Sequence, residues 1–291
     1  MGRSYENRIV AFVDMLGTSD RVLADSTGKF TNAVHKVVSA MSGKHSTIWL
    51  MVPHVGTGKA IPIQFDRPFE RADRMTTLSD GIVMSFPAIE RANELAKGSK
   101  SLPILRCLEA VFWLQRGFLS VGLRTRGGIC RGRLVHTNNF VYGEGMVRAY
   151  RLESRVAVFP RTVIDQDVVD TLLSEAIPKI ILFENRIAHM VRVDQDGRYF
   201  VDYLGYDPIQ GGASLSDRMR DIYEQTVEDL KSASDPKILE KLQWLKRYIV
   251  CTAEEMAGER SRLEANSNST FGSKFQRSSD NLISYAKRAS E

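Results

Sequence analysis

Cysteine is scarce in this sequence: Cys107, Cys130 and Cys251 lie far apart and form no Cys-x-x-Cys pair. An odd number of isolated cysteines indicates reduced thiols rather than a disulfide framework. Long apolar runs are missing as well, because no stretch approaches the roughly 18 apolar residues of a membrane helix. The opening residues, MGRSYENRIV, also lack the basic and apolar pattern of a signal peptide. These scarcities predict a cytoplasmic protein without a membrane partner.

No large excess of charge of either sign is present. The net charge is +5, and the basic residues are spread along the 291-residue chain without a lysine-rich arm. This balance suits an anionic ligand and argues against a nucleic acid as partner. The five histidines show no spacing typical of metal ligands, so we expect no zinc site.

Apolar and β-branched runs bounded by turn residues predict strands, and apolar residues at helical spacing predict helices. The expected strands are 7–16, 122–136 and 160–166, with hairpins over 74–86 and 189–204 that turn at Asp-Gly. The expected helices are 31–43, 102–120 and 143–157. Residues 53–75 are mixed in character and are expected to form loops.

This order of elements predicts an α+β fold whose core is a ferredoxin-like β-α-β-β-α-β arrangement. After about residue 207 the character changes to amphipathic helices, 216–230 and 235–250, which begin at aspartate and proline signals. From Asn266 the chain is rich in serine and asparagine and is expected to be loosely ordered. We therefore expect a main domain over 1–207 and a helical C-terminal extension with a flexible tail over 208–291.

One stretch, AFVDMLGTSD at residues 11–20, ends an apolar strand with the single carboxylate of Asp14 and then turns at once on Gly17. A second carboxylate, Asp80, stands at the tip of the expected hairpin. In a ferredoxin-like sheet the first strand and the central hairpin are neighbours, so Asp14 and Asp80 are expected to meet at one end of the sheet. Two carboxylates beside a backbone turn suit hard divalent ions that hold a triphosphate. Each aspartate alone is also explained by an ordinary strand end or an Asp-Gly hairpin.

A third motif, RGGICRGRLVHTNNFVYGEGMVRAYRLES, adds glycines and arginines in a fixed order. With it, residues 7 to 165 resemble the class III nucleotidyl cyclase family. FVDMLG matches that family's strand motif FxDxxG, and Asp80 matches its hairpin aspartate, although Ser79 replaces the glycine before it. The later matches are to RxGIxxG and to a glycine followed eight residues on by an arginine: Arg126, Gly128, Ile129, Gly132, Gly143 and Arg151. The segment VYGEGMVRAYRLESRVAVFPR is similar to the pyrimidine cyclases of the Pycsar antiphage system.

The resemblance implies a class III cyclase domain that closes the ribose 3′-oxygen of a nucleoside triphosphate onto its α-phosphate and releases pyrophosphate. Asp14 and Asp80, with the carbonyl of Met15, would hold two divalent cations per site, Mn²⁺ or Mg²⁺. The backbone of the turn and one arginine would contact phosphates: Leu16, Gly17, Thr18 and Arg126. Arg151 would stabilise the transition state, although a surface pairing with Glu144 or Glu153 also explains it. The family's two-fold homodimer, in which each site takes metal ligands from one chain and the arginine from the other, is implied as well.

Three substrate-facing positions depart from the family pattern. Val147 stands where the family usually has a ribose-orienting asparagine. Thr76 and Phe140 replace the lysine and aspartate with which adenylyl cyclases read adenine. A bulky Phe140 is expected to favour a smaller pyrimidine base, and a core role for Phe140 is an equal alternative.

The leading hypothesis is a uridylate cyclase that converts UTP to 3′,5′-cyclic UMP as a messenger in antiphage defence, acting on a separate cyclic-nucleotide-binding effector. A cytidylate cyclase acting on CTP is the first alternative. A cyclase for cyclic AMP or GMP is disfavoured by the missing adenine-reading pair. A non-catalytic nucleotide-binding module is favoured by Val147 and disfavoured by the two aspartates and Arg151.

Overall fold

The computed structural model describes residues 4–42, 47–53, 60–66, 73–89, 98–174, 190–205 and 212–266. The chain divides into two compact units, Met1–Tyr203 and Leu204–Glu291. Each unit is described separately below. We retain 1–207 and 208–291 as the proposed domains.

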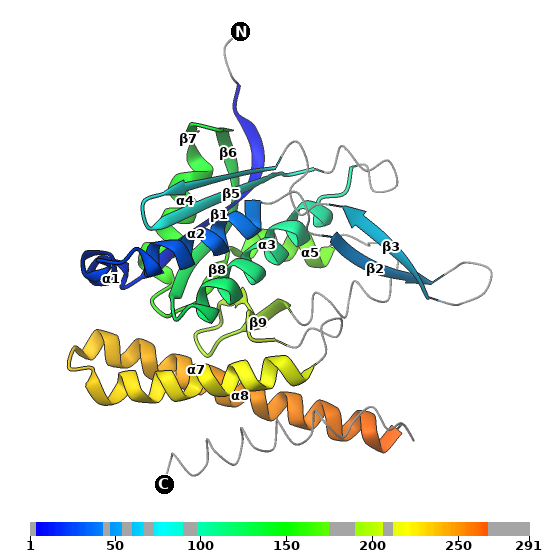
Figure 1. The fold of residues 1–291 in the computed structure, drawn as a ribbon. Helices are drawn as coiled ribbons and strands as arrows, with labels where there is room; N and C mark the ends of the chain where they lie inside the picture. The colour runs from blue at the N-terminus through cyan, green and yellow to red at the C-terminus, as the bar shows by residue number, and fades with distance from the viewer. Residues whose placement is uncertain are drawn as a thin grey trace. The chain divides into compact units, whose positions relative to one another are not determined.

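The first unit is built on a mixed sheet in which β1, Glu6–Leu16, lies between β5 and β6 (Figure 1). Its other main strands are β4 Arg74–Leu78, β5 Gly81–Pro87, β6 Arg124–Thr137, β8 Thr162–Ile164, β9 Val191–Val193 and β10 Tyr199–Val201. Their order across the sheet is β4-β5-β1-β6-β8-β10-β9, and the short strand β7, Phe140–Tyr142, pairs with β6. β1 is antiparallel to both β5 and β6, and β8 is parallel to β6.

The first four strands of this order form the predicted ferredoxin-like core. Along the chain, β1 is followed by α1, Thr18–Ala24, and α2, Lys29–Ser42, then by the β4–β5 hairpin, by α3, Ser101–Ser120, and by β6. This is the β-α-β-β-α-β connection, with the first strand placed between the hairpin and the last strand. The α+β prediction and the ferredoxin-like order are confirmed.

The two faces of the sheet are covered by different helices. Val10 and Phe12 of β1 form a buried cluster with Ala149 of α4, the helix Glu144–Arg151. Side chains alternate along a strand, so Ile9, Ala11 and Val13 point to the opposite face, where they are buried. α3 packs against β1, β5 and β6. Asp14 shares the parity of Val10 and Phe12 and therefore lies on the α4 face.

Two parts of the chain differ from the sequence expectation. Residues 53–75 were expected to be loops, but residues 60–66 form β3, Ala60–Asp66, which pairs with β2, Thr47–Pro53, in a separate two-stranded sheet (Figure 1). Pro62 within β3 is compatible with this pairing because each strand of a two-stranded sheet has a free edge. The described structure also contains α5, Gln166–Ser174, after β8.

The β4–β5 hairpin is confirmed, but its turn lies one residue earlier than the Asp-Gly pair suggested. Leu78 pairs with Gly81, so the turn residues are Ser79 and Asp80. Ser79 has a φ of 53°, the one positive value for a non-glycine among the described residues. Gly81 is needed for space rather than for its backbone angle, because an added Cβ would lie 2.6 Å from Cε2 of Phe12.

α4 lies unusually close to the sheet and continues into a π-helical turn, Leu152–Val156. A Cβ on Gly128 would lie 2.4 Å from the Cβ of Leu152 and 2.5 Å from the carbonyl oxygen of Ala149. A Cβ on Gly132 would lie 2.7 Å from the Cα of Gly145. The two glycines of the RxGIxxG motif therefore allow direct contact between strand and helix backbones.

The second unit contains two helices that pack on each other, α7, Gly212–Ser232, and α8, Pro236–Asn266. The side chain of Asp235 accepts a hydrogen bond from the amide of Lys237 at 2.7 Å, as its role as a helix start predicted. Trp244 and Tyr248 are buried with ring centroids 5.2 Å apart, which confirms that they are packing residues. The expected loose tail lies outside the described residues. None of the described helices combines the length and apolar character that crossing a membrane requires.

Candidate active site

Asp14 and Asp80 lie at the same end of the sheet. Asp14 lies near the end of β1 opposite Gly81, and the amide of Met15 donates to the carbonyl oxygen of Asp80 at 3.0 Å. The side chain of Asp14 is 19% exposed, and Asp80 is exposed at the hairpin tip. The structure therefore places at one end of the sheet the two aspartates that the sequence predicted to meet there.

The turn after β1 has the shape that a close backbone approach requires. Gly17 has φ 68° and ψ 29°, in the left-handed region that favours glycine. The hydroxyl of Thr18 donates to the carbonyl oxygen of Met15 at 3.4 Å, and both residues are buried. Leu16 is half-buried, and Gly17 is exposed.

Arg126 lies between two carboxylates on the α4 face. It is directly opposite Asp14 in the β1–β6 pairing, and its Nε lies 3.5 Å from Oδ2 of Asp14. The same Nε lies 2.5 Å from Oε1 of Glu153, a side chain that is only 2% exposed. Burial raises the pKa of Glu153 above its usual value, with Arg126 acting against this and Asp14 and Asp80 adding to it. Arg126 thus lies close to two carboxylates, and the charge of Asp80 also acts on Glu153.

Glu153 is the residue of this cluster to which the sequence assigned no role of its own. It lies in the π-helical turn, a feature that is common at functional sites. The only sequence signal was the Leu-Glu pair that follows Arg151. Glu153 had been considered as a partner of Arg151, but it contacts Arg126 instead.

The donors at this end of the sheet fit a hard divalent cation. The two aspartates and the Met15 carbonyl supply oxygen, the ligand type that Mg²⁺ and Mn²⁺ prefer. Among the described residues there is no cluster of three or more histidine, cysteine, aspartate or glutamate side chains placed to hold a metal. Any ion here would therefore depend on two carboxylates, and it would share Asp14 with Arg126.

Arg151 and Val147 lie on α4, and both are exposed. Glu144, the other suggested partner of Arg151, instead lies 3.4 Å from Arg133 and 4.0 Å from Arg148. Within the described part of the chain, Arg151 makes no ion pair or hydrogen bond through its side chain. Arg148, next to Val147, donates to Asp165 at 2.6 Å, so it is not free to take the place of the missing asparagine.

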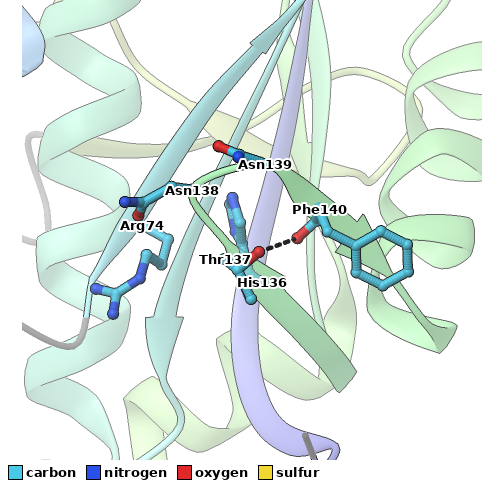
Figure 2. Close-up of a pocket in the computed structure, with 6 residues that line it drawn as sticks. All are labelled: Arg74, His136, Thr137, Asn138, Asn139 and Phe140. Atoms are coloured by element: carbon cyan, nitrogen blue, oxygen red, sulfur yellow. Dashed lines mark hydrogen bonds between the residues drawn. The ribbon is translucent and has the colours of Figure 1, made fainter.

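Phe140 and Thr76 lie near a hollow of about 660 Å³. Its lining residues are Arg74, His136, Thr137, Asn138, Asn139 and Phe140 (Figure 2). The Phe140 ring is 53% exposed, stacks on Tyr142 with centroids 5.9 Å apart, and points away from Arg74 and His136 (Figure 2). Within one chain the ring therefore does not narrow the hollow, and it is not a core residue.

His136, which the sequence left without a role, is central to a buried polar network. Its Nε2 lies 2.9 Å from Oγ1 of Thr76, and its Nδ1 lies 2.8 Å from Oγ of Ser85. Burial lowers the pKa of His136 from its usual 6.5 to about 4, and the charges of Arg8 and Arg74 act in the same direction. The imidazole is therefore neutral at physiological pH. Spacing along the sequence could not reveal this network, because its members come from four strands.

Comparison with solved structures gives loose alignments to cyclase domains. The monomeric guanylyl cyclase domain of the RhoGC fusion protein from the aquatic fungus Blastocladiella emersonii aligns with 70% of this chain and 98% of its own, at 13% identity and a TM-score of 0.39. A bacterial light-regulated adenylyl cyclase aligns over 76% of this chain and 100% of its own, at 11% identity and a TM-score of 0.34. No protein-family model and no curated protein matches the chain. We therefore base the function on the residues of the site.

Proposed function

We propose that this protein is a nucleotidyl cyclase of the class III type. It would join the ribose 3′-oxygen of a nucleoside triphosphate to the α-phosphorus, break the bond from that phosphorus to the bridging oxygen, and release pyrophosphate. The observation that supports the proposal is that Asp14 and Asp80 lie at one end of the sheet, where Asp14 is opposite Gly81 and the amide of Met15 donates to the carbonyl oxygen of Asp80. The sequence motifs that contain Arg126 and Arg151 follow Asp14 and Asp80 along the chain in the order of the family pattern.

Asp14, Asp80 and the carbonyl of Met15 would hold two divalent ions, Mn²⁺ or Mg²⁺. When bound, such ions neutralise phosphate charge and favour loss of the 3′-hydroxyl proton. With the left-handed turn at Gly17, the backbone amides of Leu16, Gly17 and Thr18 would bind phosphate oxygens. Arg126, already placed beside Asp14, would contact the phosphates.

Arg151 would stabilise the charge that develops in the transition state, and it would do so in a second copy of the chain. Its exposure and its lack of a described partner support this role. Large apolar side chains that are half exposed or more also lie on α4 and β7: Phe140, Tyr142, Val147 and Tyr150. Such a surface suits an isologous homodimer, in which each of two sites takes aspartates from one chain and Arg151 from the other.

UTP is the proposed substrate and 3′,5′-cyclic UMP the product, with CTP as the alternative. The absence of the adenine-reading lysine and aspartate at Thr76 and Phe140 supports a pyrimidine, as does the similarity to the antiphage pyrimidine cyclases. The product would act on a separate cyclic-nucleotide-binding effector in antiphage defence. Val147, which offers no hydrogen bond to a ribose, favours the remaining candidate, a nucleotide-binding module without activity.

The proposal is tested by incubating the full chain with the four ribonucleoside triphosphates and Mn²⁺ or Mg²⁺, and separating the products by mass. We expect cyclic UMP to form fastest, cyclic CMP more slowly, and the purine products poorly. Asp14→Asn is the matched inactive control. No cyclic product from any triphosphate, while the protein still binds nucleotide, would support the non-catalytic module.

A further inference from the structure

A buried chain of hydrogen bonds leads from β1 to Thr76 on β4. Nε of Arg8 donates to Oγ of Ser85 at 2.8 Å, Oγ of Ser85 lies 2.8 Å from Nδ1 of His136, and Nε2 of His136 lies 2.9 Å from Oγ1 of Thr76. Arg8, Ser85 and His136 are all buried, whereas Thr76 is half-buried. The chain of contacts therefore ends at a side chain that a ligand is able to reach.

The direction of each hydrogen bond follows from the donor at its start. Arg8 has no acceptor atom, so Ser85 Oγ accepts from it, and the hydroxyl proton of Ser85 needs another partner. Among the described residues the acceptor for that proton is Nδ1 of His136. His136 therefore carries its own proton on Nε2 and donates it to Thr76. The opposite tautomer would leave the fully buried hydroxyl of Ser85 without an acceptor, which is costly.

Among the described residues, this direction leaves the hydroxyl proton of Thr76 without an acceptor. If Nε2 accepted from Thr76, only lone pairs would remain for a ligand. Because Nε2 donates, Thr76 offers a proton on its accessible side. Since burial and the charges of Arg8 and Arg74 lower the pKa of His136 to about 4, this arrangement persists at neutral pH.

Space for a ligand lies next to this network. His136 and Arg74 both line the hollow (Figure 2). Arg74 precedes Thr76 by two residues on β4, so the side chains of Arg74 and Thr76 lie on the same face of the strand. Asn138 and Asn139 line the hollow from the β6–β7 turn (Figure 2). The lining is polar, as the edge of a nucleobase requires.

We propose that Thr76 is the specificity-determining residue of the site and that Arg8, Ser85 and His136 position its proton toward the 4-carbonyl oxygen of uracil. The inference rests on the proposed function and deepens it by choosing UTP over CTP. Cytosine carries an amino group at this position. Thr76 could accept from that amino group through its remaining lone pair, but its own proton would then have no acceptor among the described residues. We expect a preference for UTP of about tenfold in kcat/KM.

The first test requires no nucleotide. Nitrogen-15 NMR of the full chain reports which ring nitrogen of His136 carries the proton. We expect the Nε2–H tautomer at pH 7, and conversion to a mixture of tautomers in Ser85→Ala. An Nδ1–H tautomer in the parent protein would overturn the inference.

The second test is an equimolar competition of UTP and CTP, with binding of each triphosphate measured in parallel. Thr76→Val should bring the UTP:CTP ratio close to one, Thr76→Ser should retain it, and Thr77→Val, on the other face of β4, should leave it unchanged. A ratio unaffected by Thr76→Val, or a parent that prefers CTP, would overturn the inference while the cyclase proposal stands. If both triphosphates bind and neither is cyclised, the proposed function fails and the ratio of dissociation constants still decides the role of Thr76.

Discussion

Arg126 Nε lies 2.5 Å from Oε1 of Glu153, and the charges of Asp14 and Asp80 also act on that buried carboxyl group. The pair is close, yet the pKa of Glu153 is raised, because burial outweighs the attraction to Arg126. Glu153 in its charged form therefore lowers the stability of the native state at neutral pH. Its presence is better explained by its effect on the placement of Arg126 than by stability.

The pair should consequently respond differently to removal of its two members. Glu153→Gln removes the buried charge and keeps the shape, so we expect the free energy of unfolding to be unchanged or up to about 1 kcal/mol higher. Arg126→Gln leaves Glu153 buried without its cation and should lower that energy by about 2 kcal/mol. Urea denaturation at pH 7 measures both, and the double variant should recover most of the loss. A large destabilisation by Glu153→Gln would show that the pair is retained for stability.

The two aspartates should be separable from folding. Asp14→Asn and Asp80→Asn each remove a charge and keep the side-chain shape, so we expect turnover to fall at least about 10³-fold. The melting temperature should stay within a few degrees of the parent, because Asp80 is exposed and Asp14 is partly exposed. Either variant turning over near the parent rate would rule out the assignment of that carboxylate to a metal.

A shared active site predicts rescue between inactive chains. Asp14→Ala protein and Arg151→Ala protein should each be inactive alone. After subunit exchange, a mixed dimer contains one site with both mutations and one with neither, so activity should return to about a quarter of the parent level if pairing is random. Two different affinity tags verify the exchange. Exchange without rescue would mean that each chain supplies both residues of its own site.

The low pKa of His136 predicts a loss of stability in acid. The unfolded chain takes up the histidine proton near pH 6.5, but the native protein takes it up only near pH 4. Between these values the unfolded state binds more protons, so stability falls as pH is lowered from 6.5 to 4, by about 3 kcal/mol in full. His136→Gln, which retains a hydrogen-bond donor but does not titrate, should lose this part of the pH dependence in urea melts. Identical pH profiles for the two proteins would show that the pKa of His136 does not differ between the native and unfolded states.

Ser79 should be a site of stored backbone strain. Its φ of 53° is unfavourable for any residue with a Cβ and ordinary for glycine. Ser79→Gly relieves that strain but gives the unfolded chain more freedom, so we expect a net gain of about 0.5 kcal/mol. Ser79→Val, which is β-branched, should lose stability instead. Thermal and urea denaturation compare the three proteins, and a loss on Ser79→Gly would indicate that the serine side chain makes a compensating contact.

The sequence predicted the parts of this fold that depend on local pattern. The strand around Val10, the hairpin around Asp80 and the helix from Glu144 were all visible from apolar periodicity and turn residues. The β3 strand was missed because a proline interrupts its short run. The reason for Gly81 was also missed, because contact with the Phe12 ring depends on a neighbouring strand.

The site was predictable where a motif names the residue and not where partners come from separate strands. Asp14 and Asp80 were expected to meet because the strand order implies it, and both residues lie at the same end of the sheet. Glu153 and His136 were not assigned roles, because their significance lies in contacts with Arg126 and with Thr76 and Ser85. The steric reading of Phe140 assumed an inward ring, and the ring is exposed instead.

The direct backbone contact of α4 with β6 also constrains how the length of this chain is able to vary in evolution. Gly128 lies against Leu152, and Gly132 lies against Gly145. These close contacts fix the position of α4 on the sheet. A single residue inserted inside the helix would rotate everything after it by about 100°. Arg151 would then turn away from its exposed position, and Glu153 would turn away from Arg126. Insertions and deletions among descendants of this sequence should therefore be absent between Gly145 and Glu153, and should collect at the Asn138–Asn139 turn and around the separate β2–β3 sheet, where added residues displace neither side chain.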